Sequence, residues 1–235
     1  MTELHFLGCG AAFYPVFGNT SAWFVRGTHF FLLDCGEDVF RKVYGLDEYR
    51  NSDQVTVVLT HMHCDHAGSL GSLLSYTWFC RGIRAKVVYP DERLIQYLTL
   101  EGIVREAYEF CPGPCREAGL MIRPVSVHHD PSMGCFGYRL EDEEERLYYS
   151  GDSSAVEDSI VEELKNGTLD RLYLDTSKHA PRDSGHGNYE ALKEKIGPEW
   201  RRRVVCMHLD CDFIEEIKRD GFLWGMNGLT GERLD

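Results

Sequence analysis

The chain has 235 residues, 43% of them hydrophobic, which is enough for one large hydrophobic core or at most two small ones, and we expect a single domain over residues 1–235. Its formal net charge of −13 argues against a protein that grips nucleic acid by general electrostatics, and we expect Arg201–Arg203, Arg81, Arg84 and Lys86 to be solvated exceptions. No apolar stretch is long enough to cross a bilayer, no secretory signal is visible, and nine scattered cysteines suit reduced thiols in a cytoplasmic protein.

The hydrophobic pattern alternates between strands and helices along the whole chain. The predicted strands are Leu4–Leu7, Ala22–Arg26, His29–Asp34, Val55–Thr60, Ala85–Tyr89, Met121–Val127, Cys135–Leu140, Arg146–Ser150, Arg171–Asp175 and Arg203–Met207. The predicted helices are Ser69–Cys80, Glu92–Leu100, Val104–Phe110, Ala155–Lys165, Tyr189–Ile196 and Ile214–Arg219. The acidic run Glu141–Glu145 is expected to be a solvated hairpin turn. This order predicts a mixed α/β domain of four layers, with helices on the outer faces of two sheets.

The most informative segment follows the predicted strand Val55–Thr60. Within six positions it offers His61, His63, Asp65 and His66, four side chains able to bind a metal ion. Imidazole and carboxylate together suit Zn²⁺ and its neighbours among the transition metals. One histidine in such a place would usually satisfy a local hydrogen bond, but this density predicts a metal site.

Other ligand-type residues emerge at the ends of later strands. His129, Asp152, Asp175 and His208 each follow or close an apolar strand. Mixed α/β sheets usually place their sites at the carboxyl ends of strands, so residues distant in sequence are expected to converge on the His61–His66 loop. Any one of them alone is more often a turn or cap residue. The occurrence of four such residues at successive strand ends is what predicts a shared site.

Several motifs together resemble the metallo-β-lactamase superfamily. Its HxHxDH signature stands here as His61, His63, Asp65 and His66, and Leu7–Ala11 with Asn19–Ser21 resembles the first hairpin of the ribonuclease Z-like and PhnP-like phosphodiesterase branch. Further motifs that resemble this branch are Leu32–Glu37 ("DCGE"), Tyr149–Ser153 ("SGDT") and Val204–His208. The resemblance implies an αββα sandwich of two mixed β-sheets flanked by helices.

The resemblance also implies a set of ligands for two divalent ions. His61, His63 and His129 would hold one ion, Asp65, His66 and His208 the other, and Asp152 would bridge them. Seven nitrogen and oxygen donors are too many for one tetrahedral ion but suit two ions about 3.5–4 Å apart. Zn²⁺ is expected, with Mn²⁺ or Fe as alternatives. His128 and His129 are adjacent, and only one should face the site because side chains alternate along an extended segment, so His129 is preferred to His128 by the family's spacing.

The predicted chemistry is hydrolysis by a metal-bound hydroxide. Asp65 would orient this nucleophile as well as bind metal, and the cations would neutralise the developing oxyanion. His186 resembles the proton-donating histidine proposed for ribonuclease Z-like enzymes, and Asp175 stands where that branch has the acidic residue that orients it. A helix-entry role for His186 is the competing interpretation, and His179 is a weaker rival.

One departure from ribonuclease Z bears on the substrate. That enzyme carries a long arm for the tRNA elbow between its third histidine and its bridging aspartate, whereas His129 and Asp152 are only 23 positions apart. This gap predicts no tRNA-gripping arm and favours a small phosphodiester or a short nucleotide. The alternative is hydrolysis of a carboxylic ester, lactone, thioester or β-lactam at the same centre. A non-catalytic metal-binding module is disfavoured because none of the seven ligands is missing, and a redox role because His63 replaces the glutamate of redox members.

Two further segments leave alternatives open. Residues 90–123, rich in tyrosine, leucine and phenylalanine, could form a lid over the site or an extra packed helical pair, and packing is favoured. Phe222, Leu223, Trp224 and Met226 are expected to pack onto the core or onto a second copy of the chain in a homodimer.

Overall fold

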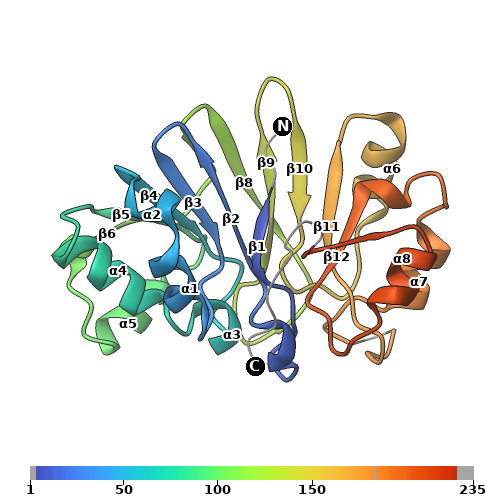
Figure 1. The fold of residues 1–235 in the computed structure, drawn as a ribbon, viewed down its shortest axis with the longest axis horizontal. Helices are drawn as coiled ribbons and strands as arrows, with labels where there is room; N and C mark the ends of the chain where they lie inside the picture. The colour runs from blue at the N-terminus through green and yellow to red at the C-terminus, as the bar shows by residue number, and fades with distance from the viewer. Residues whose placement is uncertain (1–3, 183, 227–235) are drawn as a thin grey trace.

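A computed structural model describes residues 4–182 and 184–226 of the chain. Within these residues the protein is a sandwich of two mixed sheets with helices on both outer sides (Figure 1). This is the predicted αββα architecture, so the fold expected from the sequence is confirmed.

The first sheet has six strands among the described residues, in the order β1-β2-β3-β4-β5-β6. They are β1 (His5–Gly8), β2 (Ser21–Arg26), β3 (His29–Leu33), β4 (Gln54–Val58), β5 (Ala85–Val88) and β6 (Tyr108–Cys111). Strands β1 to β3 are antiparallel neighbours, and β3 to β6 run parallel. Helices cover its outer face: α1 (Val39–Gly45), α2 (Asp47–Arg50), α3 (Cys64–Ala67), α4 (Leu70–Phe79) and α5 (Arg93–Leu100).

The second sheet has seven strands in the described part of the chain, in the order β13-β12-β11-β10-β9-β8-β7. They are β7 (Cys115–Glu117), β8 (Leu120–Ser126), β9 (Phe136–Glu141), β10 (Arg146–Tyr149), β11 (Arg171–Asp175), β12 (Val204–Met207) and β13 (Leu223–Trp224). Strands β10 to β13 are parallel, and β7 to β10 are antiparallel. The outer helices here are α6 (Asp158–Asn166), α7 (Tyr189–Lys195) and α8 (Ile214–Arg219).

Strand β3 shows how the layers are held together. All five of its residues are buried, because the strand has apolar neighbours on both faces. Phe30 and Leu32 pack with the helices outside the first sheet, while Phe31 and Leu33 pack between the two sheets. Successive side chains of a strand point to opposite faces, so a continuous apolar run is what a strand buried on both sides requires.

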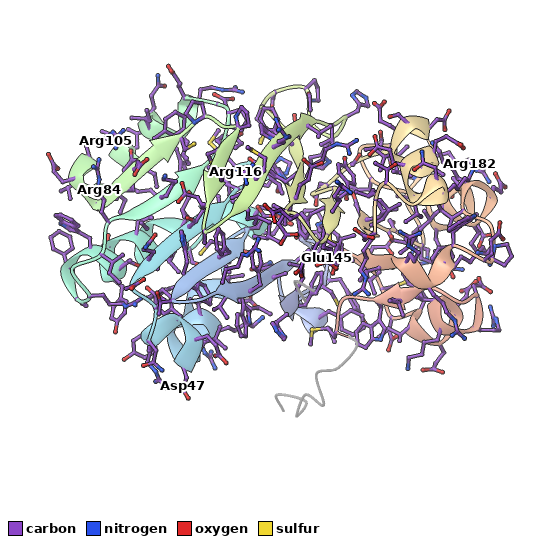
Figure 2. The ribbon with its side chains drawn as sticks, turned by 90° about the horizontal axis from the view of Figure 1, so that it is seen from above. Asp47, Arg84, Arg105, Arg116, Glu145 and Arg182 are labelled. Carbon is purple, nitrogen blue, oxygen red and sulfur yellow. The ribbon has the colours of Figure 1, made fainter. Side chains whose placement is uncertain are left out.

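The predicted helix Val104–Phe110 is wrong. Arg105–Ala107 form a single 3-10 turn, and Tyr108–Cys111 form β6, which pairs in parallel with β5. Pairing with β5 satisfies the backbone of this short segment, and its aromatic residues favour a strand. Arg84 and Arg105 lie close to each other in Figure 2, and both donate hydrogen bonds to the carbonyl oxygen of Tyr108 (3.2 and 2.8 Å).

The segment 90–123 is packed structure, as favoured from the sequence, but it is not the expected helical pair, because α5 is followed by strands. It contributes α5 and β6 to the first layer and then passes into β7 and β8 of the second sheet. The C-terminal apolar residues also pack inward: Phe222 is buried, and Leu223, Trp224 and Met226 lie against the core. All nine cysteines are free. No helix within the described ranges has the length and apolar character needed to span a membrane.

The arginine run before β12 differs from its predicted solvated state. Arg201–Arg203 form a 3-10 turn, and two of the three side chains point at backbone carbonyls. Arg201 donates to the carbonyl oxygens of Ile196, Lys193 and Asp220, while Arg203 donates to those of Leu164, Leu169 and Asp170. Several of these acceptors lie at helix ends: Leu164 in the last turn of α6, Lys193 and Ile196 at the end of α7, and Asp220 directly after α8.

Candidate metal centre

The predicted ligand loop leaves β4 at its carboxyl end and turns at once into the short helix α3 (Figure 1). Asp34 fixes the start of this loop, because its carboxylate accepts hydrogen bonds from the backbone N–H (2.7 Å) and the hydroxyl of Thr60. The end of the loop lies tight against Gly36, where a Cβ atom would collide with the carbonyl oxygen of Asp65. Thr60, Asp34 and Gly36 therefore shape the loop that presents the HxHxDH side chains.

Three histidines form a first group of donor atoms. His61 Nε2 lies 2.9 Å from His63 Nδ1, and His129 Nε2 lies 3.3 Å from the same atom. His61 is buried, while His63 is about one-third exposed on the solvent side of the group. His128 is exposed and outside the group, so the structure places His129, the preferred residue of the pair, among the donors.

A second group contains two carboxylates and two imidazoles, all of them buried. His66 Nε2 lies 3.2 Å from Asp65 Oδ2, and His208 Nε2 lies 3.3 Å from that oxygen. His208 adopts a left-handed backbone conformation with φ of 57°, which is uncommon outside glycine and typical of functional sites. The residue thus leaves β12 in a turn that directs its ring at the group.

Asp152 stands between the two groups. Its Oδ1 lies 3.2 Å from His66 Nε2, and its Oδ2 lies 3.3 Å from His208 Nε2. The same Oδ2 lies 3.6 Å from His129 Nε2 and 3.8 Å from His61 Nε2. A carboxylate within reach of both donor groups has the arrangement that a bridging ligand requires.

The donor set fits divalent ions on three counts. Donors around a tetrahedral zinc ion, with bonds of about 2.0–2.1 Å, lie roughly 3.3 Å apart, close to the spacings in both groups. His66 Nε2 and Asp152 Oδ1 are buried and have no hydrogen-bond partner among the described residues, a state that costs free energy unless something else binds them. Four carboxylates, Asp34, Asp65, Asp152 and Asp175, are buried within the centre and demand nearby cations.

The buried carboxylates also change the pKa values of the neighbouring histidines. Although burial opposes it, the carboxylates of Asp152 and Asp175 raise the pKa of His208 to about 10, and those of Asp152 and Asp34 raise the pKa of His66 well above its usual value. Burial lowers the pKa of His61 well below the ordinary value. The buried carboxylates thus favour the protonated forms of His66 and His208, and bound divalent ions would displace those protons.

Every imidazole in the two groups has a polar atom within 3.4 Å of its other ring nitrogen, and in all but His208 the contact is a hydrogen bond. The pairs are His61 Nδ1 with Thr60 Oγ1 (3.1 Å), His63 Nε2 with Asp130 Oδ2 (3.1 Å), His66 Nδ1 with Asp34 Oδ2 (2.9 Å), His129 Nδ1 with the carbonyl oxygen of Gly185 (2.9 Å) and His208 Nδ1 with Asp175 Oδ1 (3.4 Å). Such partners set the tautomer and the orientation of a metal-binding imidazole. The sequence prediction included Asp175 but missed Asp34 and Asp130, although Asp34 lies in the DCGE motif.

The predicted proton donor lies beside the centre. His186 Nδ1 is 2.8 Å from Asp175 Oδ2, and its ring stacks on that of His208 with centroids 5.1 Å apart. Burial tends to lower the pKa of His186, but the hydrogen bond and charge of Asp175 raise it above its usual value. The rival, His179, is 73% exposed and pairs instead with Asp210. The structure therefore brings His186 and Asp175 to the centre and leaves His179 outside.

Several known proteins are similar to this chain in sequence or in fold. A family model described as "Anti-Pycsar protein Apyc1" matches residues 2–225. The protein of that name from Bacillus phage BSP38 is 28% identical over 237 residues, which cover 88% of each chain. YhfI of Bacillus subtilis, described as a probable metallo-hydrolase, is 26% identical over 193 residues, covering 77% of this chain and 76% of YhfI.

Solved structures give the same architecture. A metallo-β-lactamase fold protein, again YhfI, matches with a TM-score of 0.69 and 18% identity, covering 92% of this chain and 90% of YhfI. A diphosphatase from the PhnP family matches with a TM-score of 0.70 and 20% identity, covering 94% and 93% of the two chains. The predicted resemblance to the ribonuclease Z-like and PhnP-like branch and the predicted class of metal-dependent hydrolase are confirmed. The chain belongs to the Anti-Pycsar protein Apyc1 family of metallo-β-lactamase-fold proteins.

Proposed function

We propose that the protein is a phosphodiesterase that hydrolyses a cyclic nucleotide at a two-ion centre. The observation that carries this proposal is the pair of donor groups sharing Asp152, with His186 and Asp175 placed beside them. Membership of a family named for anti-Pycsar proteins, which are phosphodiesterases of cyclic nucleotides, supports the substrate class. We assign His61, His63 and His129 to one ion, Asp65, His66 and His208 to the other, and Asp152 to both.

Divalent ions held there would polarise the phosphoryl group and lower the pKa of a water molecule toward neutrality. Asp65, which lies among the donor atoms, would accept a hydrogen bond from such a water and orient it toward the phosphorus atom. As the new oxygen–phosphorus bond forms, the bond to the ribose oxygen breaks, and His186 donates a proton to that leaving oxygen. Asp175 orients the His186 ring through the bond to Nδ1, which leaves Nε2 to carry the donated proton.

The hairpin between His129 and Asp152 argues for a small substrate. Strands β9 and β10 fill this interval, paired from Tyr138 with Tyr149 to Glu141 with Arg146. The segment therefore holds no arm of the kind that grips the tRNA elbow in ribonuclease Z. This agrees with the net charge of −13, which disfavours a long polyanion as substrate.

The test is turnover of a defined substrate panel by protein loaded with Zn²⁺ or Mn²⁺. We expect cyclic nucleotides to be opened to the linear monophosphate, measured by ³¹P NMR, and bis-p-nitrophenyl phosphate to react more slowly. Asp152→Asn should abolish turnover, while the matched control Asp142→Asn, in the distant β9–β10 hairpin, should not change it. Turnover of tRNA precursors alone, or of no phosphodiester at all, would contradict the proposal.

Carbonyl substrates form the second candidate, because the same centre would stabilise the oxyanion of an ester, lactone, thioester or β-lactam. Nitrocefin, a lactone and a glutathione thioester therefore belong in the same panel.

Zinc as the native ion, a cytoplasmic location and a homodimer stay predictions of this proposal. Elemental analysis of protein purified without added metal identifies the ion, and light scattering measures the mass in solution.

A further inference from the structure

His63 differs from the other four imidazoles of the centre in two respects. It directs Nδ1 at the other donors, whereas His61, His66, His129 and His208 direct Nε2. Its side chain is also 35% exposed, against 1–7% for the other four. A ring that water can reach is not held by packing alone, so its orientation depends on the partner at its outer nitrogen.

That partner is Asp130, and its carboxylate is itself fixed. Asp130 Oδ2 lies 3.1 Å from His63 Nε2, and Oδ1 accepts the backbone N–H of Ser132 (2.7 Å). The carboxylate therefore spans two bonds in a closed local turn. An imidazole with its proton on Nε2, donated to Asp130, has a lone pair on Nδ1, the nitrogen that faces the other donors.

The loop that carries Asp130 is anchored from the first sheet. The Arg93 guanidinium, held by Asp91, donates to the carbonyl oxygen of Ser132 (2.7 Å). The hydroxyl of Tyr89, which directly follows β5, donates to the carbonyl oxygen of Gly134 in the same loop (2.7 Å). Residues that follow β5 in the first sheet thus hold a loop that belongs to the second sheet.

We propose that Asp130 is a positioning residue that fixes the tautomer and the orientation of His63, and so selectively completes the three-histidine ion site. This inference rests on the proposed metal centre. The same loop then performs two tasks, because it supplies His129 as a donor and, in the next residue, the carboxylate that prepares His63. Removing such an outer partner typically weakens metal affinity 10–100-fold.

The test compares metal affinities of the two ions in the wild type, Asp130→Asn and Asp142→Asn. Asp142 is the matched control, because its Oδ1 also accepts backbone N–H groups two and three residues ahead (2.8 Å each), in the distant β9–β10 hairpin. In Asp130→Asn, the amide oxygen can keep the bond from the backbone N–H of Ser132, and the amide N–H group then faces His63 Nε2. A donor in that position favours the tautomer with its proton on Nδ1, which cannot bind a metal ion through Nδ1. Competition with a chromophoric chelator measures each affinity, Co²⁺ absorption reports on each site, and thermal unfolding of chelator-treated protein reports on the fold.

We expect Asp130→Asn to weaken one ion about 10–100-fold, with the other within about threefold and the unfolding of the metal-free protein unchanged. Asp142→Asn should bind both ions as the wild type does. Two ions of wild-type affinity in Asp130→Asn would overturn the assignment, as would equal weakening of both ions with a less stable fold. If the wild type takes up no ion, the proposed function fails, and this assignment fails with it. If the wild type binds two ions but Asp130→Asn binds them equally well, only the assignment of Asp130 fails.

Discussion

At the scale of single residues, the centre depends on imidazole having two nitrogens. One nitrogen of each ring faces the donor groups, and the other lies 2.9–3.4 Å from a carboxylate, a hydroxyl or a backbone carbonyl. Asp175 extends this arrangement, since its two oxygens lie against His208 and His186 respectively. A single carboxylate therefore couples the orientation of a candidate ligand to that of the candidate proton donor.

Replacing His186 by alanine should lower kcat about 10²–10⁴-fold, because the leaving oxygen loses its proton donor. Both ions should remain bound, since His186 is not among the assigned ligands. Steady-state kinetics with a cyclic nucleotide, together with elemental analysis, measure the two effects. His179→Ala serves as the control and should retain full turnover, because His179 lies outside the centre. A His186→Ala enzyme with wild-type kcat would show that another group donates the proton.

The adjacent histidines 128 and 129 provide a second residue-scale prediction. His129→Ala should lose one of the two ions, because His129 Nε2 lies among the donors, whereas His128→Ala should keep both. Elemental analysis of the two purified variants checks this directly. The opposite pattern, with metal lost only from His128→Ala, would mean that the loop rearranges when ions bind.

The structure brings together the residues that the sequence predicted for the candidate centre, but their outer partners Asp34 and Asp130 were not predicted. HxHxDH is local, so its spacing alone indicates metal binding. The outer partners are not local: Asp34 reaches His66 across 32 positions and Asp130 reaches His63 across 67. Nothing in the sequence marks such a pair as neighbours, because only the fold brings a strand end and a distant loop together.

At the scale of elements, prediction succeeded where burial imposes a clear pattern. Helix α8 has the predicted bounds, and β11 and β12 agree within one residue. Short elements at sheet edges were missed or mistaken, such as β7, β13 and the segment Val104–Phe110. These edge segments take their conformation from one neighbouring strand rather than from their own periodicity.

The arginines before β12 show how one element stabilises the end of another. Arg203→Lys should lower the free energy of unfolding by about 1–2 kcal/mol, because a single ammonium group cannot serve the three carbonyls that the guanidinium reaches. Urea unfolding followed by circular dichroism measures the change. Arg202→Lys is the control, since Arg202 is exposed, and should stay within about 0.5 kcal/mol of wild type. Equal stability of both variants would remove the proposed capping role of Arg203.

At the scale of the whole molecule, the centre joins the two sheets. Candidate ligands come from the loops after β4 of the first sheet and after β8, β10 and β12 of the second. Tyr138 adds a polar link, because its hydroxyl on β9 lies 2.8 Å from the carbonyl oxygen of Leu59 and 3.2 Å from that of Val88. Ions bound at the centre would therefore oppose separation of the sheets.

Removal of metal should consequently destabilise the whole fold. Ions that bind only the folded state at about 100 times their dissociation constant contribute about 2.7 kcal/mol per site. For a domain of this size we expect the midpoint of thermal unfolding to fall by about 5–11 °C for each ion removed. Calorimetry before and after chelation measures the shift of the midpoint. In Asp152→Asn, which lacks the ligand assigned to both ions, chelation should change the midpoint little. A midpoint that does not respond to chelation would mean that the ions bind without coupling to the fold.

The wide separation of the candidate ligands along the chain has a consequence for biosynthesis. His208 follows His61 by about 150 positions, so the last donor leaves the ribosome long after the first. At about 5–20 residues per second, translation of that interval takes roughly 7–30 s. During this time the nascent HxHxDH loop exposes imidazoles to whatever metal is available around the ribosome. On the proposed two-ion centre, the ion that the finished protein carries would therefore depend on exchange after release as well as on the geometry of the mature centre.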